Sequence, residues 1–420
     1  MTAESTPSPT VWRRMRGATL VGIGMAVMNA GAYLFTLISV HALAPADFGA
    51  LTAMLGLVLI GNVASLGLQA SGARRIATHG PGHEVLAASL LRAGRYGAAG
   101  LGVFTLLISP LVVWALHIDS VVAVLLLAPT LALLTVLGAQ AGVLQGGQHW
   151  RELAWLYVAV GVGRVVFGGL ALLIRPDLPG VLTGIVAGAA VPVLLAGWLL
   201  RGRGPGSATE VRLVLRETVH GTHVLLAFFA IANADVLLAR NVLDARHSGI
   251  YAAGVIIAKA CLFLPQFVMV VVFPSLASNP GDTRRLRGAV AAVGGLGLCA
   301  IAGAWLLPDL VVAVFGGTEY AEIGPIAWLF ATTGSVYAVL QLVVYAAIAQ
   351  QERRAAPVIW CGLVVLALVA LLVIGTGHVS GASGVKLLAA TAGGCSGLLS
   401  LVLAAGLRRQ GMRKAERCGS

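Results

Sequence analysis

The sequence predicts an all-α polytopic membrane protein with about twelve transmembrane helices. The chain has 420 residues, of which 58% are hydrophobic and only 10% are charged, whereas soluble proteins carry about 25% charged residues. Apolar runs of about 20 residues recur from Gly17 to Leu407, and each is long enough to cross about 30 Å of hydrocarbon. Such continuous runs exclude a membrane β-barrel, because its strands alternate apolar and polar residues.

The apolar runs fall into two groups of six, separated by the longest basic loop. The expected spans are residues 17–42, 49–69, 96–117, 121–145, 153–174 and 180–200, then 222–243, 250–276, 288–307, 323–349, 357–375 and 384–406. The expected organisation is a tail (1–16), an N-terminal six-helix half (17–200), a basic linker (201–221), a C-terminal six-helix half (222–406) and a basic tail (407–420). Transporters are often built from two such halves around a central site.

Basic residues indicate the orientation of the spans. Most of the 28 lysines and arginines lie on one side of the predicted spans, for example within residues 13–16, 74–95, 201–216 and 408–417. Because short basic loops stay in the cytoplasm, both termini are expected to be cytoplasmic. The net charge of +12 is spread between apolar spans and not gathered on a soluble face with stacking aromatics, so we expect no nucleic-acid partner.

Sequence motifs for enzymes and ATP-driven pumps are missing. The chain contains no phosphate-binding loop ending in Gly-Lys-Ser/Thr, no G-x-G-x-x-G, no H-E-x-x-H and no G-x-S-x-G. Its five cysteines form neither a C-x-x-C pair nor a Cys/His metal spacing. We therefore expect that the protein is not an enzyme and uses no cofactor or metal.

Four ionisable residues interrupt the apolar spans: Arg164, Asp235, Arg240 and Lys259. An ionised side chain at mid-bilayer costs about 2.5–3.5 kcal/mol on insertion scales, so such residues usually face a wet cavity or one another. One interpretation is a cationic cavity that binds an anionic headgroup, with Asp235 as a counter-ion or ion-coupling site. The alternative is a static ion pair between helices.

Helix geometry limits which of these residues can pair. Asn233 and Arg240 are seven residues apart and share a helix face, whereas Asp235 and Arg240 are separated by about 140° around the helix. Asp235 must therefore find its partner on another helix. Among the uncharged polar residues in the spans, Asn29 and Gln145 are the better cavity candidates, and most of the others are expected to hydrogen-bond between helices.

Glycine spacing predicts close helix packing and a repeat. Two series have the spacing that lets helices approach closely: 138/142/146 and 180/184/188. In addition, Leu43 and Gly49 at the first expected hairpin recur as Leu243 and Gly249 at the first hairpin of the second half. This recurrence favours two parallel repeats related by an axis along the membrane normal.

Several short segments also follow one another in a distinctive order. They are Leu43–Leu51 (LAPADFGAL), Gly67–Gln69 (GLQ), Ala73–Ala77 (ARRIA), Leu144–Gln148 (LQGGQ), the mid-span Arg164, Asn233–Asp235 (NAD), Gly249–Tyr251 (GIY) and Phe273–Leu276 (FPSL). This series resembles the motifs of the polysaccharide exporters, the Wzx-like lipid-linked oligosaccharide flippases of the multidrug/oligosaccharidyl-lipid/polysaccharide (MOP) superfamily. The resemblance runs from Gly17 to about Pro274. Ala44 replaces the family's hairpin glycine, and His149-Trp150 replaces its basic-aromatic pair.

The resemblance implies a multi-pass flippase of the bacterial inner membrane that serves surface polysaccharide biosynthesis. It would move a polyprenyl-pyrophosphate-linked oligosaccharide between leaflets by alternating access. Its partners would be this lipid-linked glycan, membrane lipid and, as candidates, glycan polymerase or ligase proteins. Arg164, Lys259 and Arg240 would bind the pyrophosphate. Asp235 is the candidate site for any ion coupling, and the sequence leaves open whether the coupling ion is a proton, sodium or none. The remaining expected substrate-binding residues are Asn233, Asn29 and Gln145.

Other functions remain open at this stage. A multidrug or cation antiporter of the same superfamily would share the fold, but a cavity for cationic drugs should be net acidic, whereas the charged residues in these spans are three basic and one acidic. A membrane-embedded glycosyl polymerase or ligase is disfavoured because no large outer loop is present. A non-transporting scaffold of a glycan-assembly complex would have no use for ionisable residues inside its spans.

Overall fold

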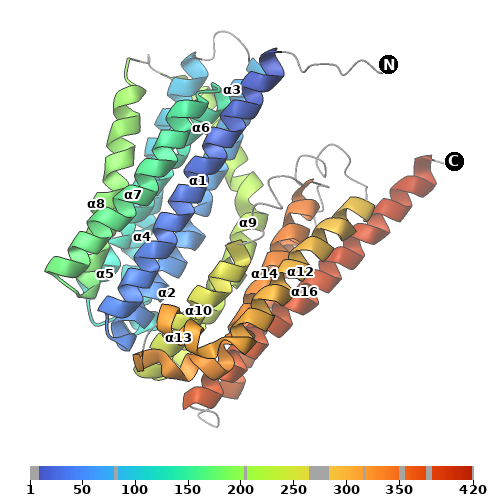
Figure 1. Cartoon of the computed structure of the whole chain (residues 1–420). Coiled ribbons are helices and arrows are strands. Elements are labelled where there is room, and N and C mark those ends of the chain that lie inside the picture. The colour runs from blue at the N-terminus through green and yellow to red at the C-terminus, as the bar shows by residue number, and fades with distance from the viewer. Residues whose placement is uncertain are drawn as a thin grey trace. The chain divides into compact units, whose positions relative to one another are not determined.

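The computed structural model describes residues 9–79, 84–202, 206–263, 283–315, 318–349, 355–374 and 381–418, and in these ranges it contains helices and no β-strand (Figure 1). Eleven helical segments in the described part of the chain are long and apolar enough to cross a membrane. The predicted all-α membrane fold is therefore confirmed. The expected span 250–276 is described only to Phe263, so its second half, with the Phe273–Leu276 motif, lies outside the described residues.

The helices follow the expected spans closely and often extend beyond them. In the first part of the chain they are α1 (Pro9–Ala42), α2 (Pro45–Gly61), α3 (Val63–His79), α4 (Glu84–Leu116), α5 (Val121–Leu125), α6 (Leu127–Gly146), α7 (Trp150–Ile174), α8 (Leu178–Leu199) and α9 (Ala208–Val242). In the second part they are α10 (Ala245–Phe263), α12 (Thr283–Leu306), α13 (Pro308–Phe315), η1 (Thr318–Ile326), α14 (Ala327–Ala349), α15 (Ala355–Val369), η2 (Ala370–Ile374) and α16 (Gly381–Cys418).

The chain divides into two compact units. Unit 1 comprises Met1–Ser39, Gly61–Val113 and Asp119–Thr222, and unit 2 comprises Val40–Ile60, Trp114–Ile118 and His223–Ser420. The main boundary at Thr222 lies one residue beyond the expected linker, residues 201–221. That these parts move as two six-helix halves, and that both termini face the cytoplasm, stay predictions.

Unit 1 is packed through glycine faces, as the spacing predicts. In this unit α7 lies along α8 and α3 lies along α6 (Figure 1). A methyl group on Gly142 would lie 3.0 Å from the carbonyl oxygen of Gln69, and one on Gly188 would lie 2.6 Å from the carbonyl oxygen of Gly163. These backbones approach too closely for larger residues, so both glycine series serve packing inside the bundle.

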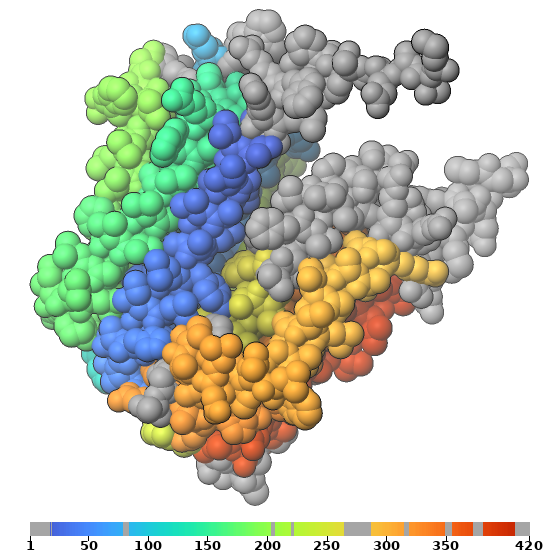
Figure 2. All heavy atoms as spheres, viewed as in Figure 1, coloured from blue at the N-terminus to red at the C-terminus, as the bar shows by residue number. Residues whose placement is uncertain are grey.

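Unit 2 has its core where α9, α10, α12, α14, α15 and α16 meet. The contact between α10 and α14 is tight, because Gly254 leaves room for the ring of Phe330 and Gly334 faces the backbone of Ala258. The outer faces of both units are apolar, as a membrane protein requires. On α1, for example, Leu20, Ile23 and Leu34 are exposed, and Figure 2 shows α1 uncovered in blue at the surface.

Helix α9 belongs to both units. It starts at Ala208, so residues 208–221 of the expected basic linker are helical. Residues up to Thr222 pack with unit 1, and residues from His223 onward pack with unit 2. One continuous helix thus carries the chain from one unit to the other.

Candidate functional site

Arg164 lies on a segment of α7 that is held from two sides by the backbones of neighbouring helices. On one side, a methyl group on Gly161 would lie 2.7 Å from the Cα of Met28 on α1. On the other side, a methyl group on Gly163 would lie 2.6 Å from the carbonyl oxygen of Gly188 on α8. Because these contacts join backbone to backbone, the position of Arg164 in unit 1 is fixed.

The guanidinium of Arg164 lies against an aromatic ring. Its Cζ is 5.3 Å from the centroid of the Phe35 ring on α1, within cation–π range. The Nε atom is buried and has no hydrogen-bond partner in the described part of the chain, although the residue as a whole is partly exposed. A buried donor without a partner costs about 1–3 kcal/mol, so a ligand that accepts a hydrogen bond from Arg164 would relieve this cost.

Gln145, the second expected site residue in unit 1, belongs to a polar cluster of three helices. The Nε2 of Gln69 on α3 donates to Gln145 Oε1 on α6 at 2.8 Å and to the Tyr157 hydroxyl on α7 at 2.7 Å. Asn29, the third, is partly exposed on α1 and directly follows Met28, the residue that faces Gly161. Asn29 therefore lies at the level along α1 where α1 contacts α7 next to Arg164.

Asp235 lies in unit 2 and has a partner on another helix, as the helix geometry predicts. Only 2% of the residue is exposed. The Tyr251 hydroxyl on α10 donates to its Oδ2 at 3.0 Å, and the Val236 N–H donates to its Oδ1 at 2.9 Å. The charge of Lys259, also on α10, acts on this carboxylate, and the Tyr337 hydroxyl on α14 lies close to it.

Asn233 is 2% exposed and sits on the same helix. Its Nδ2 donates to the Phe229 carbonyl at 2.8 Å, while its Oδ1 is buried without a hydrogen-bond partner among the described residues. A methyl group on Gly56 of α2 would lie 3.6 Å from this oxygen. Asn233 thus offers one unused acceptor, which is compatible with its predicted role in binding.

Arg240 is engaged by the protein itself. It donates to the Leu116 carbonyl at 3.1 Å and the His117 carbonyl at 2.9 Å, and also to the Ala46 carbonyl at 3.4 Å and Ser248 Oγ at 3.2 Å. A cation next to the last carbonyls of a helix stabilises that end, here the end of α4. These contacts favour a structural role for Arg240, and its predicted role in substrate binding stays a prediction.

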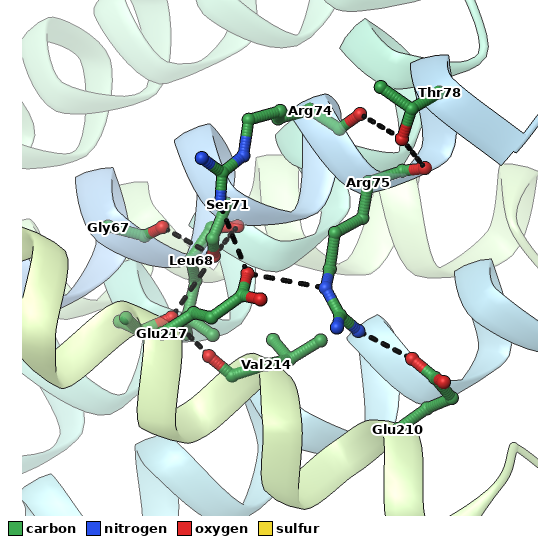
Figure 3. Close-up of polar contacts among 10 residues, drawn as sticks. Gly67, Leu68, Ser71, Arg74, Arg75, Thr78, Glu210, Val214 and Glu217 are labelled. Atoms are coloured by element: carbon green, nitrogen blue, oxygen red, sulfur yellow. Dashed lines mark hydrogen bonds and ion pairs between the residues drawn. The ribbon is translucent and has the colours of Figure 1, made fainter.

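An ion-pair cluster joins α3 to the first part of α9 within unit 1 (Figure 3). Arg75 contacts Glu210 and lies 3.2 Å from Glu217, while Arg74 lies 3.3 Å from Glu217. On the same two helices, Ser71 Oγ lies 3.1 Å from Thr218 Oγ1. The sequence indicated only that Arg74 and Arg75 mark a basic end. Glu210 and Glu217 are seven residues apart and therefore share one face of their helix, and this spacing was the signal that could have revealed the cluster.

The structure divides the predicted site residues between the units. Arg164, Asn29 and Gln145 lie in unit 1, and Asn233, Asp235, Arg240 and Lys259 lie in unit 2. Sequence reasoning assigned no role to Phe35 or Tyr251, although Tyr251 stood in the GIY segment. Tyr251 could have been noticed, because it is a single tyrosine among small apolar residues. Phe35 could not, because a phenylalanine in an apolar span is ordinary.

Comparison with known families gives one match over most of the chain. The model of the polysaccharide biosynthesis protein family matches residues 16–279. No curated protein matches this sequence closely enough to count as a relative.

Solved structures share the fold at low sequence identity. A multidrug resistance MATE family transporter of the MOP superfamily, in an inward-facing conformation, is 12% identical with a TM-score of 0.73, covering 95% of this chain and 99% of that one. The lipid II flippase MurJ, in an inward closed conformation, is 10% identical with a TM-score of 0.72, covering 94% and 91%. A MOP superfamily transporter from Pyrococcus furiosus, described as having a binding pocket of reverse polarity, is 12% identical with a TM-score of 0.56, covering 99% and 100%.

Proposed function

The chain belongs to the polysaccharide biosynthesis protein family, and on this premise we propose that it is a flippase for a polyprenyl-pyrophosphate-linked oligosaccharide. The protein would move this lipid across the bacterial inner membrane by alternating access. Membership of the family supports a role in polysaccharide assembly. The MOP fold, which a lipid II flippase also has, supports movement of a lipid-linked substrate.

The observation that carries the proposal is the unpartnered Arg164. Its Nε is buried without an acceptor, and no ion pair to a carboxylate is present for it among the described residues. A pyrophosphate would supply both the negative charge and the acceptor oxygens, and arginine binds phosphate groups through paired N–H donors. A cationic drug would leave Arg164 without an acceptor and add a second positive charge.

Asp235 is the proposed ion-coupling residue. Its carboxylate is buried, accepts hydrogen bonds from Tyr251 and Val236, and lies in the field of Lys259. Binding of a proton or sodium ion would weaken the attraction between Asp235 and Lys259. The change would reach α10 through Tyr251, which packs edge-on against Phe330 of α14 with ring centroids 5.2 Å apart.

The proposal is tested by removing the protein from its host and measuring lipid-linked oligosaccharide by mass spectrometry, together with surface glycan. Wild-type protein and the variants Arg164→Ala, Arg164→Lys and Asp235→Asn are then restored one at a time. The matched control is Arg212→Ala, which removes an exposed arginine from α9. Membrane levels of each variant are measured so that loss of protein is not read as loss of function.

The expected result is that the lipid-linked species accumulates and surface glycan falls when the protein is absent. Wild-type protein and Arg212→Ala restore both quantities, whereas Arg164→Ala does not, and Arg164→Lys restores them in part because it keeps the charge. Unchanged lipid-linked pools in the deletion strain would exclude the flippase function and favour the antiporter or the scaffold.

A further inference from the structure

We propose that Phe35 is a positioning residue that presents the Arg164 guanidinium to the anionic headgroup. This inference rests on the proposed function, because it assigns a second residue to the same binding site. The Arg164 Cζ lies over the Phe35 ring, 5.3 Å from the ring centroid. A phenyl ring attracts the cation without an oxygen or nitrogen acceptor, so this contact leaves the N–H groups of Arg164 available to an anion.

The Phe35 ring fits against α7 at Gly168, which has no side chain. Gly168 lies four residues after Arg164, so the two share a face of the helix. A methyl group on Gly168 would overlap the edge of the Phe35 ring, which means that the ring occupies the space a side chain would take. Phe35 is itself 0% exposed. The ring is therefore fixed between the Gly168 backbone and the Arg164 guanidinium.

An aromatic partner suits a binding arginine better than an acidic one. A carboxylate beside Arg164 would neutralise its charge and occupy its donors, so the incoming pyrophosphate would have to displace it. The negative face of an aromatic ring attracts the cation without accepting those hydrogen bonds. Phe35 thus stabilises a charged side chain inside the membrane and leaves its charge for the ligand.

The decisive variant is Phe35→Leu, which removes the aromatic face and keeps an apolar side chain. Binding of undecaprenyl pyrophosphate to purified protein in nanodiscs is measured for the wild type, Phe35→Leu, Arg164→Ala and the double variant. Undecaprenol, which lacks the pyrophosphate, is the neutral probe. We expect Phe35→Leu to weaken pyrophosphate binding about tenfold, the effect of a desolvated cation–π contact, and to leave undecaprenol binding unchanged.

The double variant separates positioning from packing. If Phe35 acts through Arg164, then Phe35→Leu has no further effect on binding in the Arg164→Ala background. A residue that only fills the core would weaken binding by the same factor in both backgrounds, and this outcome would overturn the inference.

If Phe35→Leu fails to fold, a second pair of variants tests whether the Phe35 ring positions Arg164. Gly168→Ala pushes the ring away without changing either partner, whereas Gly169→Ala adds a methyl group where no atom lies within 4 Å. We expect Gly168→Ala alone to weaken pyrophosphate binding. If Arg164→Ala weakens binding but Phe35→Leu and Gly168→Ala match the wild type, the positioning role is wrong and the proposed function survives. If Arg164→Ala itself binds like the wild type, the proposed site is wrong.

Discussion

Gly49 and Gly249, which hold equivalent places in two hairpins, pack directly against each other. A methyl group on Gly49 would lie 3.1 Å from the backbone nitrogen of Gly249, and one on Gly249 would overlap the carbonyl oxygen of Pro45. The recurrence of leucine and glycine at 43/49 and 243/249 is thus matched by a backbone contact between the α1–α2 turn and the start of α10, which both belong to unit 2.

Replacing Gly249 should destabilise this contact. Gly249→Ala forces the two backbones apart, and overpacking of this kind costs about 1–3 kcal/mol. The expected outcome is a lower midpoint of thermal unfolding in detergent. Gly294→Ala is the matched control, because Gly294 lies in α12 of the same unit with no atom within 4 Å of the added methyl group. Equal midpoints for the two variants would contradict the prediction.

Arg240 and Arg164 should respond to substitution in opposite ways. Arg240→Ala removes four hydrogen bonds and leaves carbonyl groups at the end of α4 without their donor, so we expect a loss of about 2–4 kcal/mol of stability. Arg164→Ala removes a charged side chain whose buried Nε has no acceptor, so stability should be unchanged or raised. Unfolding of both variants in parallel measures the difference. A larger loss for Arg164→Ala would be evidence against both assignments.

The ion pairs between α3 and α9 provide a comparison of adjacent arginines. The Arg75 side chain is 16% exposed and contacts two glutamates, whereas the Arg74 side chain is 70% exposed and contacts one. Because exposed pairs contribute about 0–1 kcal/mol, Arg74→Ala should have little effect. Arg75→Ala should lower stability more, since it leaves the partly buried Glu210 without a cation and Glu217 with only the exposed Arg74. Denaturation at low and high salt tests this, and the Arg74 contribution should fall more with salt.

Acid should weaken the α9–α10 turn. Burial opposes ionisation of Asp244, but hydrogen bonds from the His247 backbone N–H and ring outweigh it and lower the pKa of Asp244 below its usual value. A lowered pKa in the folded state means that this stabilisation is complete above about pH 4 and is lost as the pH falls further.

The difference in unfolding midpoint between wild type and Asp244→Asn should therefore be present at about pH 6 and shrink toward about pH 3. Asp309→Asn, at an exposed position on α13, is the control. A difference that stayed constant with pH would show that Asp244 acts by packing and not by charge.

The sequence by itself determined the membrane fold, the positions of the spans, the close-packing glycine series and the family. These properties depend on hydropathy, on helical periodicity and on short motifs, which are local features of the chain. It also singled out Arg164 and Asp235, because an ionisable residue in an apolar run is conspicuous without any structure.

The tertiary structure decided which groups these residues meet. Phe35 beside Arg164, Tyr251 beside Asp235 and Glu210 beside Arg75 are far apart in the chain or on different helices. Their meeting depends on how each helix is rotated and which neighbour it contacts, and packing of the whole bundle fixes both. For the same reason only the structure could show that Arg240, which the sequence grouped with the binding residues, donates hydrogen bonds to the carbonyls at the end of α4.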